Sequence, residues 1–212
     1  MNHLGPMEEY KIFCLVQREL KPQENNQKII MNTLKLLFSY YWRLSLLKET
    51  PENSPYSVFL LIVMSVLFSI IMLIQWDIAE LDFSRDWSLS LMMATSLILS
   101  FIFYTYAILK FQNLASRLVQ TSTCLLSAYI IIHVLATPLF LIDTYLSAEN
   151  LKTPIFLFIG MIYLFITLGL SIWQFVITAH IYKFALGTTP VKSVLAAFGL
   201  VAVNILTISF WR

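Results

Sequence analysis

Five stretches of the chain are long, apolar and free of formal charge, and they constrain the fold more than any other feature. They cover residues 56–76, 87–109, 124–142, 155–179 and 193–211. A helix needs about 20 apolar residues to cross the hydrocarbon core of a bilayer, whereas a barrel strand needs about 10 residues of alternating polarity. The stretches have the helical length and lack the alternation. The sequence therefore predicts an all-α, polytopic membrane protein with five transmembrane helices.

The composition agrees with a bilayer as the solvent of this chain. Apolar residues make up 58% of its 212 residues and charged residues only 12%. Soluble domains have about 45–50% apolar and about 25% charged residues. The formal net charge of +2 gives no basis for nucleic-acid binding. We therefore expect the lipid bilayer, and not a nucleic acid, to be the main partner.

The basic residues are divided unequally between the segments that connect the stretches. The tail before the first stretch and the second and fourth connections hold eleven of the fourteen Lys and Arg residues. Cytoplasmic segments of membrane proteins carry an excess of Lys and Arg. We therefore predict a cytoplasmic N-terminus and a C-terminus on the opposite side. The first 30 residues mix acids with bases and lack a signal-peptide pattern, so the first span is expected to act as the insertion signal.

Residues 1–55 are interpreted as a cytoplasmic tail and residues 56–212 as the transmembrane domain. Within the tail, residues 28–48 have an amphipathic pattern at helical spacing. We predict an N-terminal amphipathic helix that lies in the membrane interface, and the alternative of a helix packed against the bundle stays open. Its apolar membrane contacts would be Leu34, Leu37, Tyr41 and Leu44, and its cations at the headgroups would be Lys28, Lys35 and Arg43.

Two smaller patterns flank this helix and the second span. Residues 49–55 contain two prolines and are predicted to turn the chain into the first span. Residues 110–119 form a second, weaker amphipathic stretch.

The amphipathic pattern of the tail becomes coherent near Met31. We therefore also hypothesise that Met31 is the start of a shorter product.

Few strongly polar side chains lie inside the spans or directly at their ends, and each of them raises the question of a functional site. They are His133, Asp143, Gln174, His180 and Asn204. His133 and His180 lie at different depths, which argues against paired haem ligation. His133 and Asp143 lie about 15 Å apart on one helix, which argues against a proton relay. We expect His133 to be a neutral, hydrogen-bonded side chain inside the bundle.

Sequence patterns of membrane enzymes are missing. The chain has no Gly-x-Ser-x-Gly, His-Glu-x-x-His or Cys-x-x-Cys motif, and its two cysteines, Cys14 and Cys124, are far apart. We therefore expect no catalytic residues, no bound metal and no cofactor.

Small and polar residues follow one face of each of the last two spans. Such faces let membrane helices approach closely and form hydrogen bonds across the interface. We predict a tightly packed hairpin, with Gln174 and Asn204 as interhelical hydrogen-bonding groups at unmatched depths. A polar path or lipid groove lined by the same faces is the functional alternative. The residues concerned are Gly160, Thr167, Ser171, Gln174 and Thr178 in one span and Ser193, Ala197 and Asn204 in the other.

The last connection carries a weak motif. Trp173-Gln174-Phe175, Ala179-His180-Ile181-Tyr182 and Gly187-Thr188-Thr189-Pro190 are followed by a small-residue span. With the tail, the amphipathic segment and the Pro51 and Pro55 turn, this layout resembles the Yip-domain family over roughly residues 31–212. The resemblance implies a five-span fold. It also implies a membrane-organising role, because eukaryotic members of that family are associated with vesicle trafficking and small GTPases.

From these patterns we expect a non-enzymatic integral membrane protein that organises the membrane or docks a partner, either another membrane protein or a second copy of itself. The alternatives are a transporter or transporter subunit, and a subunit of a larger membrane-envelope complex. The short tail and the short loops between the spans favour a bacterial inner membrane, with the eukaryotic ER or Golgi as the alternative.

Overall fold

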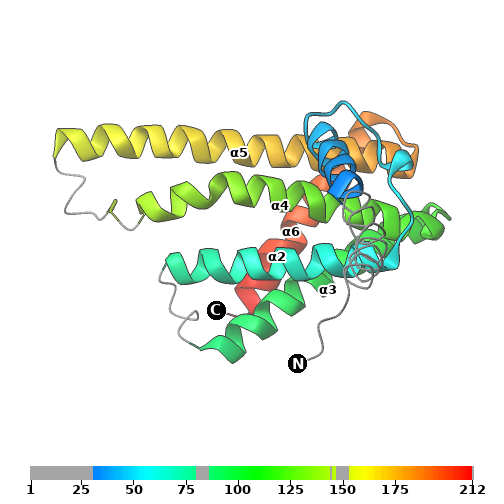
Figure 1. The fold of residues 1–212 in the computed structure, drawn as a ribbon, viewed down its shortest axis with the longest axis horizontal. Helices are drawn as coiled ribbons and strands as arrows, with labels where there is room; N and C mark the ends of the chain where they lie inside the picture. Colours follow the sequence, from blue (N-terminus) through cyan, green and yellow to red (C-terminus); the bar gives the residue numbers. More distant parts are fainter. Residues whose placement is uncertain (1–30, 80–85, 144, 147–152, 212) are drawn as a thin grey trace, which may run out of the picture. The chain divides into compact units, whose positions relative to one another are not determined.

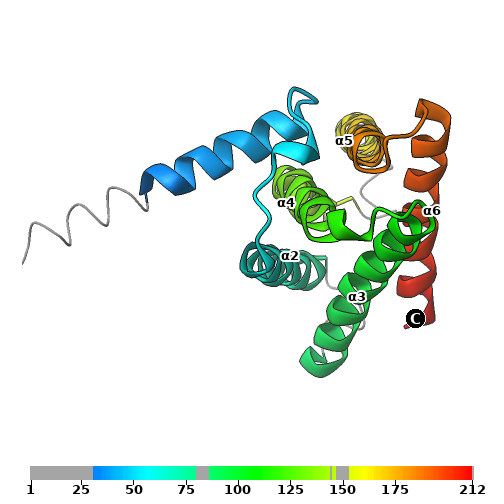
Figure 2. The same cartoon turned by 90° about the vertical axis from the view of Figure 1, so that its right-hand side faces the viewer.

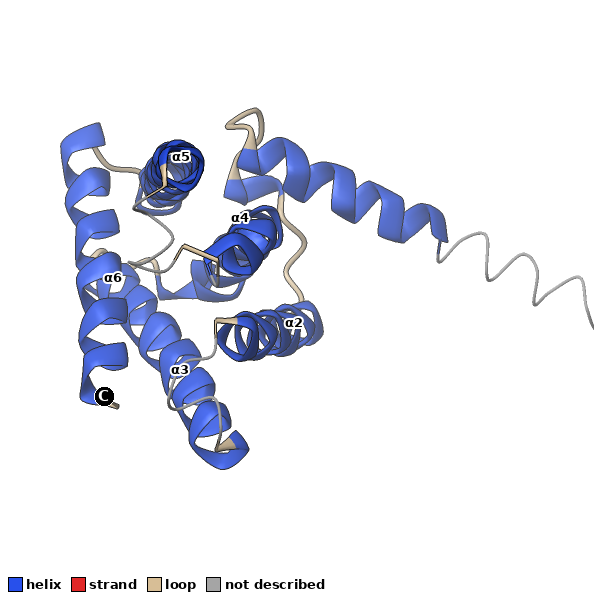
Figure 3. Cartoon of the chain, turned by 90° about the vertical axis from the view of Figure 1, so that its left-hand side faces the viewer, coloured by secondary structure: helices blue, strands red, loops and turns tan. Residues whose placement is uncertain are grey.

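The computed structural model describes residues 31–79, 86–143, 145–146 and 153–211, and this part of the chain is helical and has no β-strand (Figure 3). The long helices are α2 (Val58–Ile78), α3 (Trp87–Phe111), α4 (Leu118–Asp143), α5 (Pro154–Leu186) and α6 (Pro190–Phe210). Each is long and apolar enough to cross a membrane. The predicted all-α, five-span fold is thereby confirmed. Two short 3-10 helices, η1 (Pro51–Asn53) and η3 (Ala115–Arg117), lie in the connections.

Local sequence signals explain where the long helices begin and end. The Ser57 hydroxyl accepts the backbone N–H of Leu60 at 3.2 Å and caps α2, and Asp86 accepts the N–H of Ser88 at 2.9 Å and caps α3. The hydrogen bonds from Ser88 hold the pKa of the Asp86 carboxyl below its usual value. Gly187, at φ 58°, ends α5 in the left-handed conformation that glycine favours.

Three helix boundaries differ from the predicted spans by three residues or more, and the others differ by two residues or fewer. Helix α4 begins at Leu118 instead of residue 124, α5 continues to Leu186 instead of residue 179, and α6 begins at Pro190 instead of residue 193. The predicted spans of α5 and α6 stop short of Lys183 and Lys192, whereas a Lys at a helix end extends its ammonium group to the interface and leaves the helix intact. The predicted span of α4 leaves out residues 118–123, most of which are polar and none of which is charged. The amphipathic stretch predicted over residues 110–119 is not one continuous helix, because α3 ends at Phe111 and a turn precedes η3.

The chain from Tyr41 onward forms one compact unit, and its centre is α4. Helix α4 packs against α2 and α5, α6 packs against α5 and α3, and α2 also contacts α3. Helices α2, α4 and α5 share a direction that α3 and α6 cross obliquely (Figures 1 and 2). Every residue of α4 from Thr121 to Tyr129 is buried. Most of them are small or hydroxyl-bearing, which permits close approach of neighbouring helices.

Residues 31–45 are helical, and Met1–Tyr40 belong to a separate unit that is described by itself. Within residues 31–40, the apolar side chains of Met31, Leu34, Leu36 and Phe38 are exposed, and Leu37 is half-buried. Lys35 is also exposed. Lys28 and the other residues before Met31 lie outside the described part of the chain.

Residues 41–54, which contain the last residues of this helix and η1, pack against the bundle. Tyr41 and Leu44 are only 3% and 0% exposed. The indole N–H of Trp173 on α5 donates to the carbonyl oxygen of Ser45 at 2.9 Å. The prediction that Tyr41 and Leu44 contact the membrane is therefore wrong: the alternative of packing against the bundle holds for these two side chains. Arg43 stays exposed and pairs with Glu49 at 3.0 Å.

Candidate functional site

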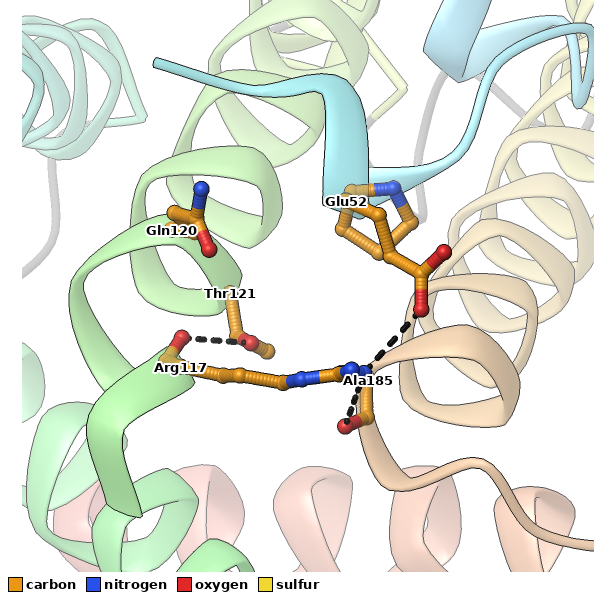
Figure 4. A pocket seen from close by; sticks show the side chains of 6 residues that line it. Glu52, Arg117, Gln120, Thr121 and Ala185 are labelled. Carbon is orange, nitrogen blue, oxygen red and sulfur yellow. Dashed lines mark hydrogen bonds and ion pairs between the residues drawn. The ribbon is translucent and has the colours of Figure 1, made fainter. Parts of the chain in front are cut away.

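Arg117 joins three segments at the end of the bundle where the tail enters, which we call the tail end. Its guanidinium Nη1 lies 3.0 Å from a carboxylate oxygen of Glu52 and donates to the carbonyl oxygens of Phe184 and Ala185 at 3.3 and 3.5 Å. Figure 4 shows this side chain reaching from η3 toward Glu52 on one side and Ala185 at the end of α5 on the other. A cation at a helix C-terminus also offsets the helix dipole.

Other polar contacts strengthen the same junction. The Gln120 amide donates to the carbonyl oxygen of Ser54 at 2.8 Å, and a ring nitrogen of His180 lies 3.1 Å from the carbonyl oxygen of Glu49. The Tyr41 hydroxyl lies 3.3 Å from the Ser54 hydroxyl, and burial raises the pKa of Tyr41 to about 12. All of these groups make structural contacts. At the tail end, they therefore hold residues 41–54 against the bundle.

A second polar cluster lies inside the bundle, between α2 and α4. A ring nitrogen of His133, Nδ1, lies 2.8 Å from the amide oxygen of Gln75. The Gln75 amide nitrogen donates to the carbonyl oxygen of His133 at 2.6 Å and to the Thr137 hydroxyl at 3.1 Å. This bond network, next to Pro138, matches the expected hydrogen-bonded His133. Gln75, only 1% exposed, was missed although an amide within an apolar stretch is a signal in itself.

Helix α4 faces α5 across a cavity of about 130 Å³. Its polar lining comprises His133 on α4 and Tyr163, Thr167, Ser171 and Gln174 on α5. Ser171 is exposed, so this lining continues to the surface of the bundle. The predicted polar stripe of α5 therefore faces α4 along part of its length, in addition to α6.

A second cavity, of about 260 Å³, lies between α5 and α6 and is also lined by Tyr129 of α4. Ser171 and Gln174 line this cavity too, so the two cavities meet at these side chains. Asn204 of α6 lies in its lining, and its amide oxygen is buried and has no hydrogen-bond partner among the described residues. A buried acceptor without a partner costs about 1–3 kcal/mol. The Ser122 hydroxyl oxygen on α4 also lacks a partner among the described residues, but of these two oxygens only that of Asn204 belongs to a residue that lines either cavity.

The remaining residues of the predicted faces have structural contacts. The hydroxyls of Thr167, Ser171 and Thr178 donate to carbonyl oxygens of their own helix, four residues earlier, at 2.8 Å, so these three bonds run along α5 and not across to α6. Ser193 likewise bonds the carbonyl oxygen of Pro190. Thr178 and Gln174 also reach the Tyr129 hydroxyl. Ala197 is fully buried, and Gly160 is half-buried outside both cavities.

The longer helices bring the polar side chains to similar depths. At 1.5 Å per residue, Gln174 lies about 18 Å from the tail-end terminus of α5, Asn204 about 21 Å from that of α6, and His133 about 22 Å from that of α4. Gln174 lines one cavity together with Asn204 and the adjoining cavity together with His133, so the expectation of unmatched depths for Gln174 and Asn204 is wrong. It rested on a span that ended at residue 179, whereas α5 continues to Leu186.

The α3–α6 contact contains residues that sequence analysis missed. The Tyr104 hydroxyl donates to the carbonyl oxygen of Ala196 at 2.8 Å, passing over Gly199, where a Cβ would collide with the tyrosine ring. The indole N–H of Trp211 donates to the Ser96 hydroxyl at 2.9 Å. One glycine among five in the sequence gives no signal of such a contact until the partner helix is known.

No group of three or more metal-ligating side chains occurs in the described part of the chain. Comparisons with family models, with curated proteins and with solved structures returned no match.

Proposed function

We propose that this integral membrane protein organises the membrane at its tail side, with the amphipathic helix inserted in one leaflet and the five-helix bundle as its anchor and docking platform. In this proposal the N-terminus is cytoplasmic and the C-terminus lies on the opposite side, as the distribution of Lys and Arg suggests. A bacterial inner membrane is the first expectation and a eukaryotic endomembrane the second. The resemblance of the sequence layout to the Yip-domain family also supports a membrane-organising role.

One observation carries the proposal. Helix 31–45 has its last turn buried, at Tyr41, Leu44 and Ser45, while Leu34 and Phe38 are 60% and 66% exposed. A free amphipathic helix binds reversibly to a leaflet. A helix that is tethered at one end to a transmembrane protein has a high effective concentration for membrane binding, whatever its orientation. Its insertion would then expand one leaflet relative to the other.

The position of the helix can be tested with an environment-sensitive fluorophore on a single cysteine. We would label Phe38→Cys or, on the polar face, Ser39→Cys, in a chain whose Cys14 and Cys124 are replaced by Ser and Ala. Quenchers attached at stated depths of the lipid acyl chains should quench the probe at residue 38. A water-soluble quencher should act mainly on the probe at residue 39. Equal exposure of both probes to water would contradict interfacial insertion.

The membrane-organising activity has its own test. The labelled protein is reconstituted into giant vesicles, and its density is compared between the vesicle and a thin membrane tube drawn from it. The parent chain should concentrate on the tube when the helix lies on the outer leaflet. A Leu34→Glu, Phe38→Glu variant should distribute evenly, while Lys35→Gln serves as a control that keeps the apolar face. Equal distribution of all three chains would overturn the proposal.

Transport is the second candidate, and the polar lining of the α4–α5–α6 cavities favours it. Transporters bind their substrates at helix breaks near the middle of the membrane. The described spans are continuous helices and have no such break, although α4 contains Pro138 in its interior. This continuity makes transport the second candidate and not the first. Solute-dependent flux in proteoliposomes would establish this candidate, and co-purification of other membrane proteins in mild detergent would favour a subunit of a larger complex.

A further inference from the structure

We infer that the cavity between α5 and α6 is a binding site for an uncharged lipid that carries a hydroxyl group. The inference is independent of the proposed role of the tail, because every residue of the site lies on α4, α5 or α6. It begins with the amide oxygen of Asn204, which is buried and lacks a hydrogen-bond partner within the described residues. Such an acceptor inside an apolar bundle is stabilised by a ligand that brings a donor.

The lining determines the chemical class of the ligand. Its polar groups are the side chains of Tyr129, Ser171, Gln174 and Asn204, and none of them carries a formal charge. A charged headgroup placed at this depth would have no counter-ion, which makes its transfer from the interface unfavourable. A hydroxyl group can donate to the Asn204 oxygen and accept from an amide N–H at the same time.

The apolar part of the lining and its position fit a lipid chain. Phe175, Val201, Ile205 and Ile208 complete the cavity. Ile205 is 58% exposed and Ser171 is also exposed, so the site opens sideways toward the bilayer. A lipid therefore has a lateral entry path. The adjoining α4–α5 cavity, which shares Ser171 and Gln174, offers additional space for the chain.

A photoreactive, alkyne-tagged monoacylglycerol tests the site in the full-length protein reconstituted in phosphatidylcholine vesicles. Its matched probe is the methyl ester of the same photoreactive fatty acid, which has the chain and lacks the hydroxyl donor. We expect the monoacylglycerol to label peptides that contain Ser171–Phe175 and Val201–Ile208 at least about fivefold more than the ester, the ratio that one neutral hydrogen bond supplies. Unlabelled monoacylglycerol should compete.

Two variants of α6 separate the site from general contact with lipid. Asn204→Leu keeps the side-chain volume and should remove the preference for monoacylglycerol. Thr207→Val is the matched control, because the Thr207 hydroxyl bonds the carbonyl oxygen of Val203 on its own helix and does not line the cavity. Equal labelling by the two probes in the parent chain, or an unchanged preference in Asn204→Leu, would overturn the inference.

Thermal unfolding in detergent micelles provides a second readout that does not depend on labelling. Monoacylglycerol should raise the midpoint temperature of the parent and of Thr207→Val, because a ligand that binds the folded state stabilises it. It should leave the midpoint of Asn204→Leu unchanged. An equal rise in all three chains would show that the lipid acts through the micelle and would overturn the inference.

Discussion

Polar groups lie at similar depth on the two sides of α4, but their hydrogen bonding differs. Toward α2, the Gln75 amide and the His133 ring complete each other's hydrogen bonds, and Phe68 and Tyr129 pack edge to face at 6.2 Å. Toward α5 and α6, cavities remain and the Asn204 oxygen lacks a partner. We call the α2–α4 and α3–α6 contacts the closed interfaces and the α4–α5–α6 region the open interface. The difference indicates that the closed interfaces hold the fold and the open interface is available for a ligand.

The largest effect is expected at the closed α3–α6 interface. Gly199→Val would place a side chain where the Tyr104 hydroxyl and ring now lie, and would separate Tyr104 from the Ala196 carbonyl. Overpacking of this kind costs about 2–3 kcal/mol. Unfolding in mixed detergent micelles measures the free energy. Gly169→Val is the control, since a Cβ at that position would have no described atom within 4 Å apart from its chain neighbours and the nearby backbone of α5 itself. Equal losses in the two variants would mean that α3 and α6 are not closely packed.

The next effect is expected at the closed α2–α4 interface. Gln75→Leu removes three hydrogen bonds and leaves a ring nitrogen of His133 without its partner. We expect a loss of about 2 kcal/mol in the free energy of unfolding. This value is near the upper end of the range that single hydrogen bonds contribute inside membrane proteins. Comparison with the double variant Gln75→Leu, His133→Leu isolates the pair. A double variant less stable than Gln75→Leu would contradict the idea that the unpaired His133 causes the loss.

A smaller effect sharpens the first prediction. Tyr104→Phe keeps the ring against α6 and removes the hydrogen bond to the carbonyl oxygen of Ala196. The expected loss is about 1 kcal/mol. Tyr106→Phe, whose ring lies beneath the Lys110 ammonium group, is the control, because phenylalanine keeps that contact. If both tyrosines can be replaced without loss, packing alone joins α3 to α6.

The smallest effect is expected at the open interface. Asn204→Leu removes an acceptor that has no partner, so we expect the free energy of unfolding to stay within about 0.5 kcal/mol of the parent or to rise. The contrast with Gln75→Leu is the direct test of the comparison, because both variants replace an interior amide with leucine. A loss at Asn204 as large as that at Gln75 would show that Asn204 has a structural role, and the distinction between the interfaces would fail.

The spans were predictable because their signal is local. About 20 apolar residues in sequence reveal a membrane helix whatever lies beside it, and His133 stood out because an imidazole in such a run needs a partner. The ends of the spans were less predictable. Helix α5 extends past His180, whose ring nitrogen lies 3.1 Å from the backbone carbonyl oxygen of Glu49. No local pattern reports a partner 131 residues away.

The sequence by itself determined the class, the number of spans and the polar side chains that must be accommodated inside them. Only the tertiary structure decided which partner each of these side chains, apolar or polar, has. The same apolar stripe places Leu34 at the surface and Leu44 inside the bundle, because a helical wheel cannot distinguish lipid from a neighbouring helix as the apolar partner. Likewise, Gln75 and Asn204 are both amides in apolar helices, and whether each finds a partner depends on which helix packs against it.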